Sequence, residues 1–323
     1  MREMVKVSAP GKLMLFGEHA VIYHRPCIVT AVDQRMIVEI KPAREEKLLL
    51  DAPGVGIKGY SKKIKDLACG EVPKGVRFIE TGIRNFFQKY KVKQGIEVKT
   101  KAGFSSEVGF GSSAAVTVGV AAGLAQLFKI RLSRKQLFDL TYKTVLDVQG
   151  VGSGFDLAAS IWGGTLYFVT GGKKVIPLKI NQLPLIVGYT GIKADTPTMV
   201  KKVANLRKNN KKLVDSIFDQ MSFLTNKAKV TLSKGNFKKT GGLMNLNQGL
   251  LDALGVNTKE LADLIFATRK AGAWGTKLSG AGGGDCMIAL VPGKMRRKAE
   301  KAIERAGGKA LKIKPNAEGV RAE

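Results

Sequence analysis

The sequence predicts an α+β protein with two domains. Helical stripes and β-branched runs are both present, but they do not alternate strictly along the chain, which favours an α+β over an α/β fold. The chain has 323 residues, of which 44% are hydrophobic and 25% charged. It can therefore bury a large core and is long enough for two domains. We place the boundary near residue 180, which gives domains 1–180 and 181–323.

In the first predicted domain, two apolar patterns and one capping motif indicate helices. Apolar residues at helical spacing cover 77–91, and a small-residue run covers 112–127 with the length and alanine content of a buried helix. Ser133 begins a third helix through Val148, with Gln136 in the capping-box position. Strands are predicted at 5–7, 13–16, 28–40, 95–100 and 163–169, and a short helix at 157–162.

The second predicted domain is mainly helical. Apolar spacing indicates helices at 198–206, 211–234, 241–254, 258–271 and 293–306, with strands at 183–189, 286–291 and 310–313. No run of about 18 apolar residues is present, so no membrane span is expected.

Charge and cysteine content argue against several classes of protein. The formal net charge is +28, from 54 Lys+Arg against 26 Asp+Glu, and such an excess attracts phosphate-rich ligands or nucleic acid. The basic residues are spread out and are not interleaved with base-stacking aromatic residues, so no specific nucleic-acid partner is expected. The three cysteines form no C-x-x-C pair, which disfavours disulfides and zinc. Without a signal peptide, we expect a cytoplasmic protein.

The first segment that suggests chemistry lies near the N-terminus. Pro10-Gly11-Lys12 predicts a turn before the short strand 13–16, and Gly17-Glu18-His19 follows that strand. Lys12 is therefore expected at one end of the strand and Glu18 with His19 at the other. On its own this pattern is weak, because a Pro-Gly turn is ordinary and a single lysine is usually on the surface.

The second segment is Gly109–Ala115, directly before the long helix. Its glycines allow successive N–H groups to point inward, and a helix N-terminus adds positive partial charge, so the pattern suits a phosphate group. Ser112 or Ser113 can cap the helix or turn a hydroxyl to a metal ion. The segment is not a P-loop, because the G-K-[ST] ending is missing.

Two further segments complete the set. Lys277–Cys286 contains four glycines within Gly280–Gly284, which lets backbone approach a ligand closely. Gly150–Asp156 places an acid after a flexible turn, where Asp156 is either a helix N-cap or a catalytic base.

The order of these four segments is similar to that in the GHMP kinase superfamily. The chain contains PGKLMLFGEHAV, then GFGSSAA, then GSGFD, then KLSGAGGGD. GFGSSAA resembles the GLGSSA phosphate loop of that superfamily, with Phe110 in place of leucine. Within the superfamily, GEHAVIYHRP and NQGLLDALGV look like the mevalonate kinase family, and the resemblance covers essentially the whole chain.

This resemblance implies a fold and a reaction. Members have an N-terminal domain resembling domain 2 of ribosomal protein S5 and a ferredoxin-like C-terminal domain, with ATP and substrate in the cleft between them. The implied reaction is ATP-dependent phosphorylation of the primary alcohol of mevalonate to 5-phosphomevalonate in isoprenoid biosynthesis, with Mg²⁺ as cofactor. Dimers are common in the family, so the resemblance also allows a homodimer.

The resemblance assigns roles by matching positions. Asp156 falls on the catalytic aspartate, with Lys12 on the lysine beside it, and Ser113 on the magnesium-binding serine. The family's magnesium-binding glutamate corresponds to Val145, and Asp147 is the nearest acid that could replace it. The expected substrate side is Lys12, Glu18, His19, Ser153 and Asp156, and the expected ATP side is Val108, Gly109, Phe110, Gly111, Ser112, Ser113, Ala114 and Gly282.

The implied chemistry is physically coherent. Asp156 would accept the proton of the alcohol, while Lys12 would keep that carboxylate ionised and stabilise developing alkoxide charge. Two alternatives stay open, because GSGFD resembles the phosphomevalonate kinases and other GHMP small-molecule kinases share the same loops. A nucleic-acid-binding protein would leave the glycine segments without a purpose. A silent ligand-sensing homologue would not need to retain Lys12 and Asp156.

Overall fold

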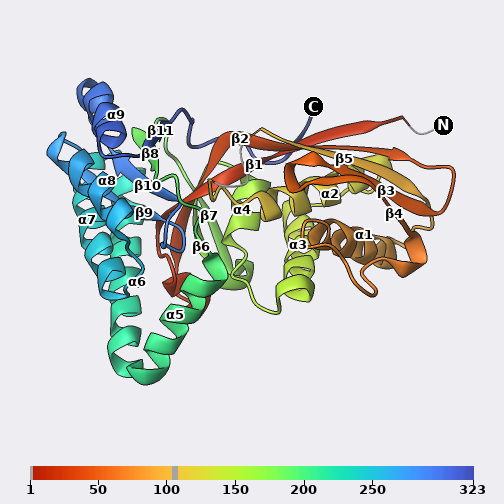
Figure 1. Cartoon of the computed structure of the whole chain (residues 1–323), viewed down its shortest axis with the longest axis horizontal. Coiled ribbons are helices and arrows are strands. Elements are labelled where there is room, and N and C mark those ends of the chain that lie inside the picture. The colour runs from red at the N-terminus through yellow and green to blue at the C-terminus, as the bar shows by residue number, and fades with distance from the viewer. Residues whose placement is uncertain (1–2, 104–107) are drawn as a thin grey trace.

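In the computed structural model, which describes residues 3–103 and 108–323, the chain folds into two halves that lie side by side (Figure 1). Within these ranges the strands form an 8-stranded and a 4-stranded sheet. Helices pack on both sheets, so the predicted α+β class is confirmed. No helix in these ranges is long and apolar enough to cross a membrane.

The first sheet is built on a long antiparallel pair of strands. Its order is β12-β1-β2-β5-β3-β4, and β6 pairs with both β2 and β7. Only β3 and β5 run parallel among its paired strands in the described ranges. The strands are β1 (Val5–Phe16), β2 (Cys27–Pro42), β3 (Lys47–Ala52), β4 (Ile57–Lys63), β5 (Ile96–Ala102), β6 (Thr165–Val169), β7 (Lys174–Leu178) and β12 (Arg321–Ala322).

Four helices cover this sheet: α1 (Arg77–Tyr90), α2 (Ser112–Leu127), α3 (Arg134–Gln149) and α4 (Phe155–Trp162). Helix α2 is apolar nearly all round and lies against β1 and β2. Its glycines permit that approach, since a Cβ at Gly119 would lie 2.7 Å from Val38 and one at Gly123 2.9 Å from Ile40. The predicted capping box of Ser133 and Gln136 is confirmed at the start of α3.

The second sheet has the order β11-β8-β10-β9 and is antiparallel throughout. Its elements follow the chain as strand, helices, strand, strand, helix, strand, which is the split β-α-β arrangement of ferredoxin-like domains. The strands are β8 (Leu185–Tyr189), β9 (Gly275–Ser279), β10 (Cys286–Leu290) and β11 (Lys309–Leu311). The helices are α5 (Thr196–Asn209), α6 (Lys211–Ser233), α7 (Phe237–Ala253), α8 (Lys259–Lys270) and α9 (Arg296–Arg305).

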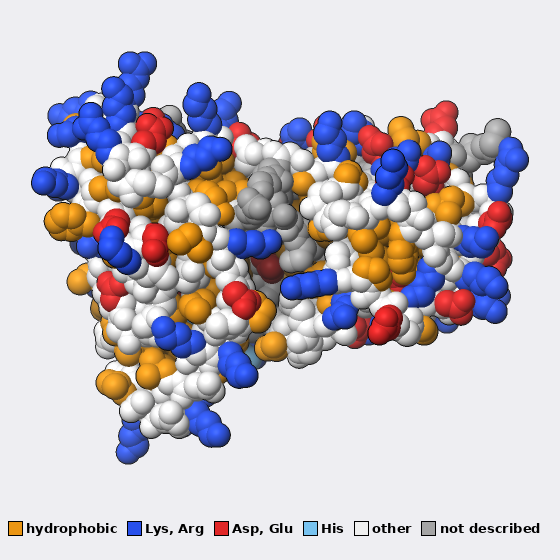
Figure 2. Space-filling model, in the orientation of Figure 1, with side chains coloured by type: hydrophobic (Ala, Val, Ile, Leu, Met, Phe, Trp, Pro, Cys, Tyr) orange, Lys and Arg blue, Asp and Glu red, His pale blue; other side chains and the backbone are white. Residues whose placement is uncertain are grey.

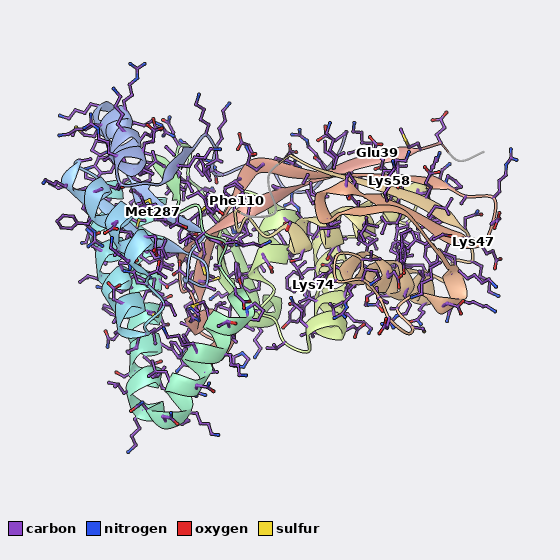
Figure 3. All side chains as sticks on the ribbon, viewed as in Figure 1. Glu39, Lys47, Lys58, Lys74, Phe110 and Met287 are labelled. Atoms are coloured by element: carbon purple, nitrogen blue, oxygen red, sulfur yellow. The ribbon has the colours of Figure 1, made fainter. Side chains whose placement is uncertain are left out.

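A shared core joins the two halves. One cluster of buried residues combines Leu13 of β1 with Val187 of β8 and Ile288 of β10, and Phe110 belongs to it. Figure 3 shows Phe110 at the junction of the halves and Met287 farther into the second half. The chain also returns to the first sheet at its end: after β11 has paired with β8 in the second sheet, β12 pairs with β1. The division near residue 180 stays a prediction.

The structure corrects the prediction made for Pro10-Gly11-Lys12 and adds five strands. Pro10-Gly11-Lys12 is not a turn before a short strand but lies inside the continuous strand β1, which absorbs the irregularity as a register shift between Pro10 and Gly11. Strands β3, β4, β7, β9 and β12 were not expected. Helix α7 begins earlier than expected, at Phe237, and α9 is preceded by a 3₁₀ turn at Gly293–Met295.

Candidate active site

The glycine segments meet where the two halves join. Figure 2 shows the surface hollowed there, with basic side chains flanking the hollow and an acidic side chain within it. Contacts across the join bring the Gly109 segment against the Asp285 segment: the Cys286 thiol lies 3.4 Å from the Val108 carbonyl oxygen. Gly109 has φ 68°, and a Cβ on it would lie 2.3 Å from a carboxylate oxygen of Asp285, so a larger residue there would be strained and would displace that carboxylate.

Lys12 is held at this junction by the Gly109 segment. Its Nζ donates to the Gly109 carbonyl at 2.8 Å, and its backbone N–H donates to the Phe110 carbonyl at 2.9 Å. The ammonium also lies 5.9 Å from the ring centroid of Phe155. Burial lowers the pKa of Lys12, while the carboxylates of Asp156 and Asp285 oppose that shift. The charges of two acids thus act on the Lys12 amine at this junction.

Asp156 stands in the first turn of α4. Gly154 is the N-cap of this helix, with φ 85°, so the N-cap interpretation of Asp156 is wrong. One Asp156 carboxylate oxygen accepts the Leu157 N–H at 3.0 Å. Burial raises the pKa of the carboxyl, and the charge of Lys12 opposes the rise. Ser153, buried just before the helix, accepts the Gly171 N–H through its carbonyl.

The start of α2 presents backbone N–H groups. Its N-cap is Gly111, at φ 78° and with no side-chain cap bond, so neither Ser112 nor Ser113 caps the helix as the sequence suggested. The first helical bond runs from Ala115 N–H to the Gly111 carbonyl. The N–H groups of the first turn therefore have no partner within the helix. Both serine side chains are half-buried there.

The third glycine segment closes the join from the second half. Gly282 has φ 76°, and a Cβ on it would lie 2.2 Å from the Val256 carbonyl oxygen. Asp285 also has a positive φ, 57°, and accepts the Ala194 N–H at 2.9 Å. Burial raises the pKa of the Asp285 carboxyl, and that hydrogen bond opposes the rise.

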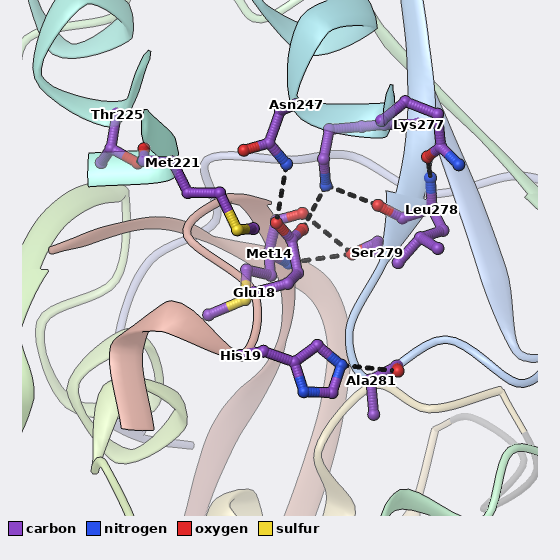
Figure 4. A network of polar contacts seen from close by, with 11 residues as sticks. Met14, Glu18, His19, Met221, Thr225, Asn247, Lys277, Leu278, Ser279 and Ala281 are labelled. Atoms are coloured by element: carbon purple, nitrogen blue, oxygen red, sulfur yellow. Dashed lines mark hydrogen bonds and ion pairs between the residues drawn. The ribbon is translucent and has the colours of Figure 1, made fainter. Parts of the chain in front are cut away.

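Glu18 lies deeper than the sequence suggested, in a closed network (Figure 4). Its carboxylate forms an ion pair with Lys277 of β9, and both side chains are 0% exposed. Asn247 of α7 donates to the other carboxylate oxygen at 3.3 Å. Lys277 donates in addition to the Leu278 carbonyl at 2.5 Å. Burial raises the pKa of Glu18 and lowers that of Lys277, while each charge opposes the shift of the other.

His19 follows Glu18 and faces the third glycine segment. Its backbone has φ 58°, and its Nε2 lies 2.9 Å from the Ala281 carbonyl oxygen. Burial lowers the pKa of this imidazole, and the contact with Ala281 opposes the shift. The ring is thus fixed between strand β1 and the glycine segment.

Asp147 lies apart from these residues. Its carboxylate accepts from Asn85 at 2.9 Å and pairs with Lys143 at 2.7 Å and Arg84 at 3.5 Å. These partners belong to α1 and α3. Among the described contacts, none joins Asp147 to the segments around Lys12 and Asp156, so the structure leaves this predicted metal ligand outside the cluster.

Sequence reasoning did not single out two residues of the junction. Asp285 ends the GAGGGD run, and its charge beside Lys12 could have been weighed there. Lys277 gave no such signal, because its partner Glu18 is 259 positions away in the chain.

Comparison with known proteins matches both halves of this architecture. A family model described as the GHMP kinases N terminal domain matches residues 77–164, and one described as GHMP kinases C terminal matches residues 228–311. The chain therefore belongs to the GHMP kinases, and the predicted two-domain fold is confirmed.

Curated relatives narrow the class. The mevalonate kinase of Pyrococcus horikoshii is 38% identical over 334 residues, which cover 100% of this chain and 99% of that protein. The mevalonate kinase of Thermococcus sibiricus is 36% identical over 330 residues, covering 99% of this chain and 98% of its own. Within the GHMP kinases, this chain is a member of the mevalonate kinase family.

Solved structures share this fold. A protein of Listeria innocua has a TM-score of 0.90 at 21% identity, with 99% of both chains covered. The phosphomevalonate kinase of Streptococcus pneumoniae has a TM-score of 0.81 at 19% identity, covering 97% of this chain and 99% of that one. At such identities the likeness concerns the fold alone.

Proposed function

We propose that the protein transfers the γ-phosphoryl group of ATP to the primary alcohol of mevalonate. The observation that carries this proposal is the meeting of Lys12 and Asp156 beside the glycine-rich start of α2, in a chain whose curated relatives are mevalonate kinases over their full length. Phosphoryl transfer depends on positioning and charge neutralisation, and these are the properties that the junction offers.

Asp156 is the base in this mechanism. Its carboxylate takes the proton of the substrate hydroxyl, and the raised pKa that burial gives it increases its basicity. Lys12, held to the Gly109 carbonyl, stabilises the negative charge that develops on the attacking oxygen. His19 and Ser153 line the substrate side, and Glu18 supports it.

ATP binds at the start of α2. The N–H groups of the segment Val108–Ala114 and the helix dipole bind its phosphates, and Gly282 closes over them from the second half. Magnesium, when bound, neutralises phosphate charge. The Ser113 hydroxyl suits it, because Mg²⁺ prefers oxygen ligands and is often held mainly by substrate phosphates. Asp147 would have to leave Asn85, Lys143 and Arg84 to reach this site.

A coupled ADP-release assay with mevalonate and 5-phosphomevalonate in parallel tests the substrate. We expect turnover with mevalonate, and we expect Asp156→Ala and Lys12→Ala to abolish most of it while retaining the fold by circular dichroism. Turnover with 5-phosphomevalonate alone would favour the alternative suggested by GSGFD. Near-normal turnover in both variants would refute the mechanism.

We extend the proposal to the protein's setting. Exposed apolar side chains on the outer helices of the second half, among them Leu246 and Phe266, support a homodimer, which analytical ultracentrifugation tests directly. Three free cysteines suit the reducing conditions of the cytoplasm.

A further inference from the structure

Strand β9 and the segment after it contact the first half at every second residue. Lys277 pairs with Glu18, Ser279 bonds to Met14, and the Ala281 carbonyl meets His19. For Lys277 and Ser279 the spacing follows from strand geometry, because alternate side chains of a strand point to one face. Ala281 lies beyond the end of β9 and makes its contact through its backbone carbonyl. One face of β9 is therefore devoted to the corner formed by residues 14–19, where β1 ends.

The Ser279 side chain bonds to both backbone groups of Met14, as the backbone of a paired strand would. Its hydroxyl accepts the Met14 N–H at 3.0 Å and donates to the Met14 carbonyl at 3.0 Å. This occurs where the β1–β2 register shifts between Met14 and Phe16. A side chain thus satisfies the backbone groups that such an irregularity releases.

The Lys277–Glu18 pair is enclosed on all sides by described residues. Both carboxylate oxygens of Glu18 are occupied, one by Lys277 and the other by Asn247. Figure 4 shows the pair above His19, whose ring lies beside Ala281. Glu18 therefore acts on the substrate side through the corner it shapes and not by contact.

The other ionisable groups that act on Glu18 are few. Lys12 of β1 attracts it, and the buried thiol of Cys27 on β2 lies close enough for its pKa to rise through the Glu18 charge. His19 is adjacent in sequence. Lys277 is the cation in direct contact with the Glu18 carboxylate. Its removal therefore takes away the main positive charge that compensates the buried negative charge of Glu18.

We propose that Lys277 is a positioning residue for mevalonate. From the second half it fixes the Glu18–His19 corner in the position that places the substrate hydroxyl beside Asp156. This inference rests on the proposed function. Breaking a buried ion pair leaves an uncompensated charge, and the corner would shift until the charge reaches water or takes a proton.

The test is Lys277→Met, assayed from pH 6 to pH 9 against the wild type. A displacement of about 1 Å costs on the order of 100-fold in rate, so kcat/KM for mevalonate should fall about 100-fold at pH 9. Without Lys277 the pKa of Glu18 rises further, because its compensating charge is gone. On acidification toward pH 6 the carboxyl takes up a proton, and the neutral acid can stay buried without displacing the corner. The ratio of variant to wild type should therefore recover about tenfold or more on acidification, with KM for ATP little changed.

Two controls separate positioning from general damage. The double variant Glu18→Gln/Lys277→Met removes both charges and should lose the pH dependence and regain most of the affinity for mevalonate. Ile303→Ala, a core truncation on α9 far along the second sheet, should lower the melting temperature without a pH-dependent KM. A Lys277→Met variant whose loss is equal at all pH values, or a double variant as impaired as the single, would overturn the proposal.

Hydrogen–deuterium exchange distinguishes this inference from failure of the proposed function. Peptides covering 13–24 should exchange faster in Lys277→Met at pH 9 than at pH 6, relative to the wild type and without any substrate. Unchanged exchange would overturn the inference even if mevalonate is the substrate. Faster exchange in a protein that does not turn over mevalonate would support the role of Lys277 in fixing the corner and would refute mevalonate as the substrate.

Discussion

Two lysine–carboxylate pairs lie close together in this molecule, and they are built differently. Lys277 and Glu18 are in direct contact, fully buried, and saturated by Asn247 and a carbonyl. Lys12 and Asp156 interact through their charges but are bound mainly to backbone, at Gly109 and Leu157. The first pair is closed to any ligand, and the second is half-buried with capacity to spare.

The difference assigns a structural role to the Lys277–Glu18 pair and a chemical role to the Lys12–Asp156 pair. A closed buried pair costs heavily to break, because each ion has lost its water and depends on the other for charge compensation. An open pair in a partly buried site keeps hydrogen-bonding capacity that a substrate can use, as acid–base chemistry requires. The closed pair therefore holds the corner formed by residues 14–19 in place, and the open pair beside it carries out the chemistry.

The largest expected effect is on catalysis, at the open pair. Asp156→Asn should lower kcat about 10²- to 10⁴-fold, because it removes the base. It should not destabilise the fold, since burial raises the pKa of Asp156 above its unfolded value and the ionised form therefore costs stability as pH rises. Steady-state kinetics and thermal melts at pH 5 and pH 8 check both; a destabilised variant with normal kcat would reverse the comparison.

The closed pair should show the opposite balance. Glu18→Gln leaves the Lys277 ammonium buried without its counter-ion, which should cost about 3–5 kcal/mol of unfolding free energy at pH 7. Burial then holds the pKa of Lys277 below its unfolded value, so stability should recover as pH rises and the amine becomes neutral. Urea unfolding at pH 7 and pH 9 measures this.

Its matched control is Glu300→Gln, which removes an exposed partner of Arg296 on α9. That change should alter the unfolding free energy by less than about 1 kcal/mol. Equal effects of the two glutamine substitutions would mean that the closed pair has no special structural weight.

A smaller effect is expected at the glycine segment that joins the pairs. Gly282→Ala introduces a Cβ 2.2 Å from the Val256 carbonyl at a positive φ, which should cost about 1–3 kcal/mol and raise KM for ATP. Gly242→Ala, in α7 with open space around it, is the control and should be neutral or stabilising by up to about 1 kcal/mol. ATP titrations and melts of both variants decide; a harmless Gly282→Ala would contradict the close packing.

The smallest effect is expected where an ion pair is exposed. Lys135→Ala removes an i,i+4 pair with Asp139 on α3, where both side chains face water. The unfolding free energy should change by less than about 0.5 kcal/mol, with kinetics unaltered. A large loss in urea unfolding would show that burial is not what distinguishes the pairs.

Sequence reasoning placed most helices correctly, because their signals are local. Residues 112–127 were expected as one buried helix and are α2 with those bounds, and the Ser133 cap was visible within four residues. Strands β4 and β9 were missed, since IKGYSKK and GTKLS contain charged or small residues whose burial depends on distant neighbours.

The site was less accessible than the fold. Lys12 and Asp156 were identified because each lies in a glycine segment that resembles a motif of the GHMP kinases, although neither segment was specific on its own. Lys277 was not, because a fully buried lysine is compatible with a strand only when a carboxylate arrives from elsewhere in the chain. Asp147 was chosen for its nearness in sequence to Val145, but its helix directs it to Asn85 and Lys143.

Single-turnover phosphorylation of mevalonate, measured by rapid quench with saturating Mg-ATP, tests the division between the two pairs most directly. Asp156→Asn should slow the chemical step at least about 100-fold, while Glu18→Gln/Lys277→Met should remain within about tenfold of the wild type. Equal losses in both variants would contradict the account, because the closed pair would then take part in the chemistry itself.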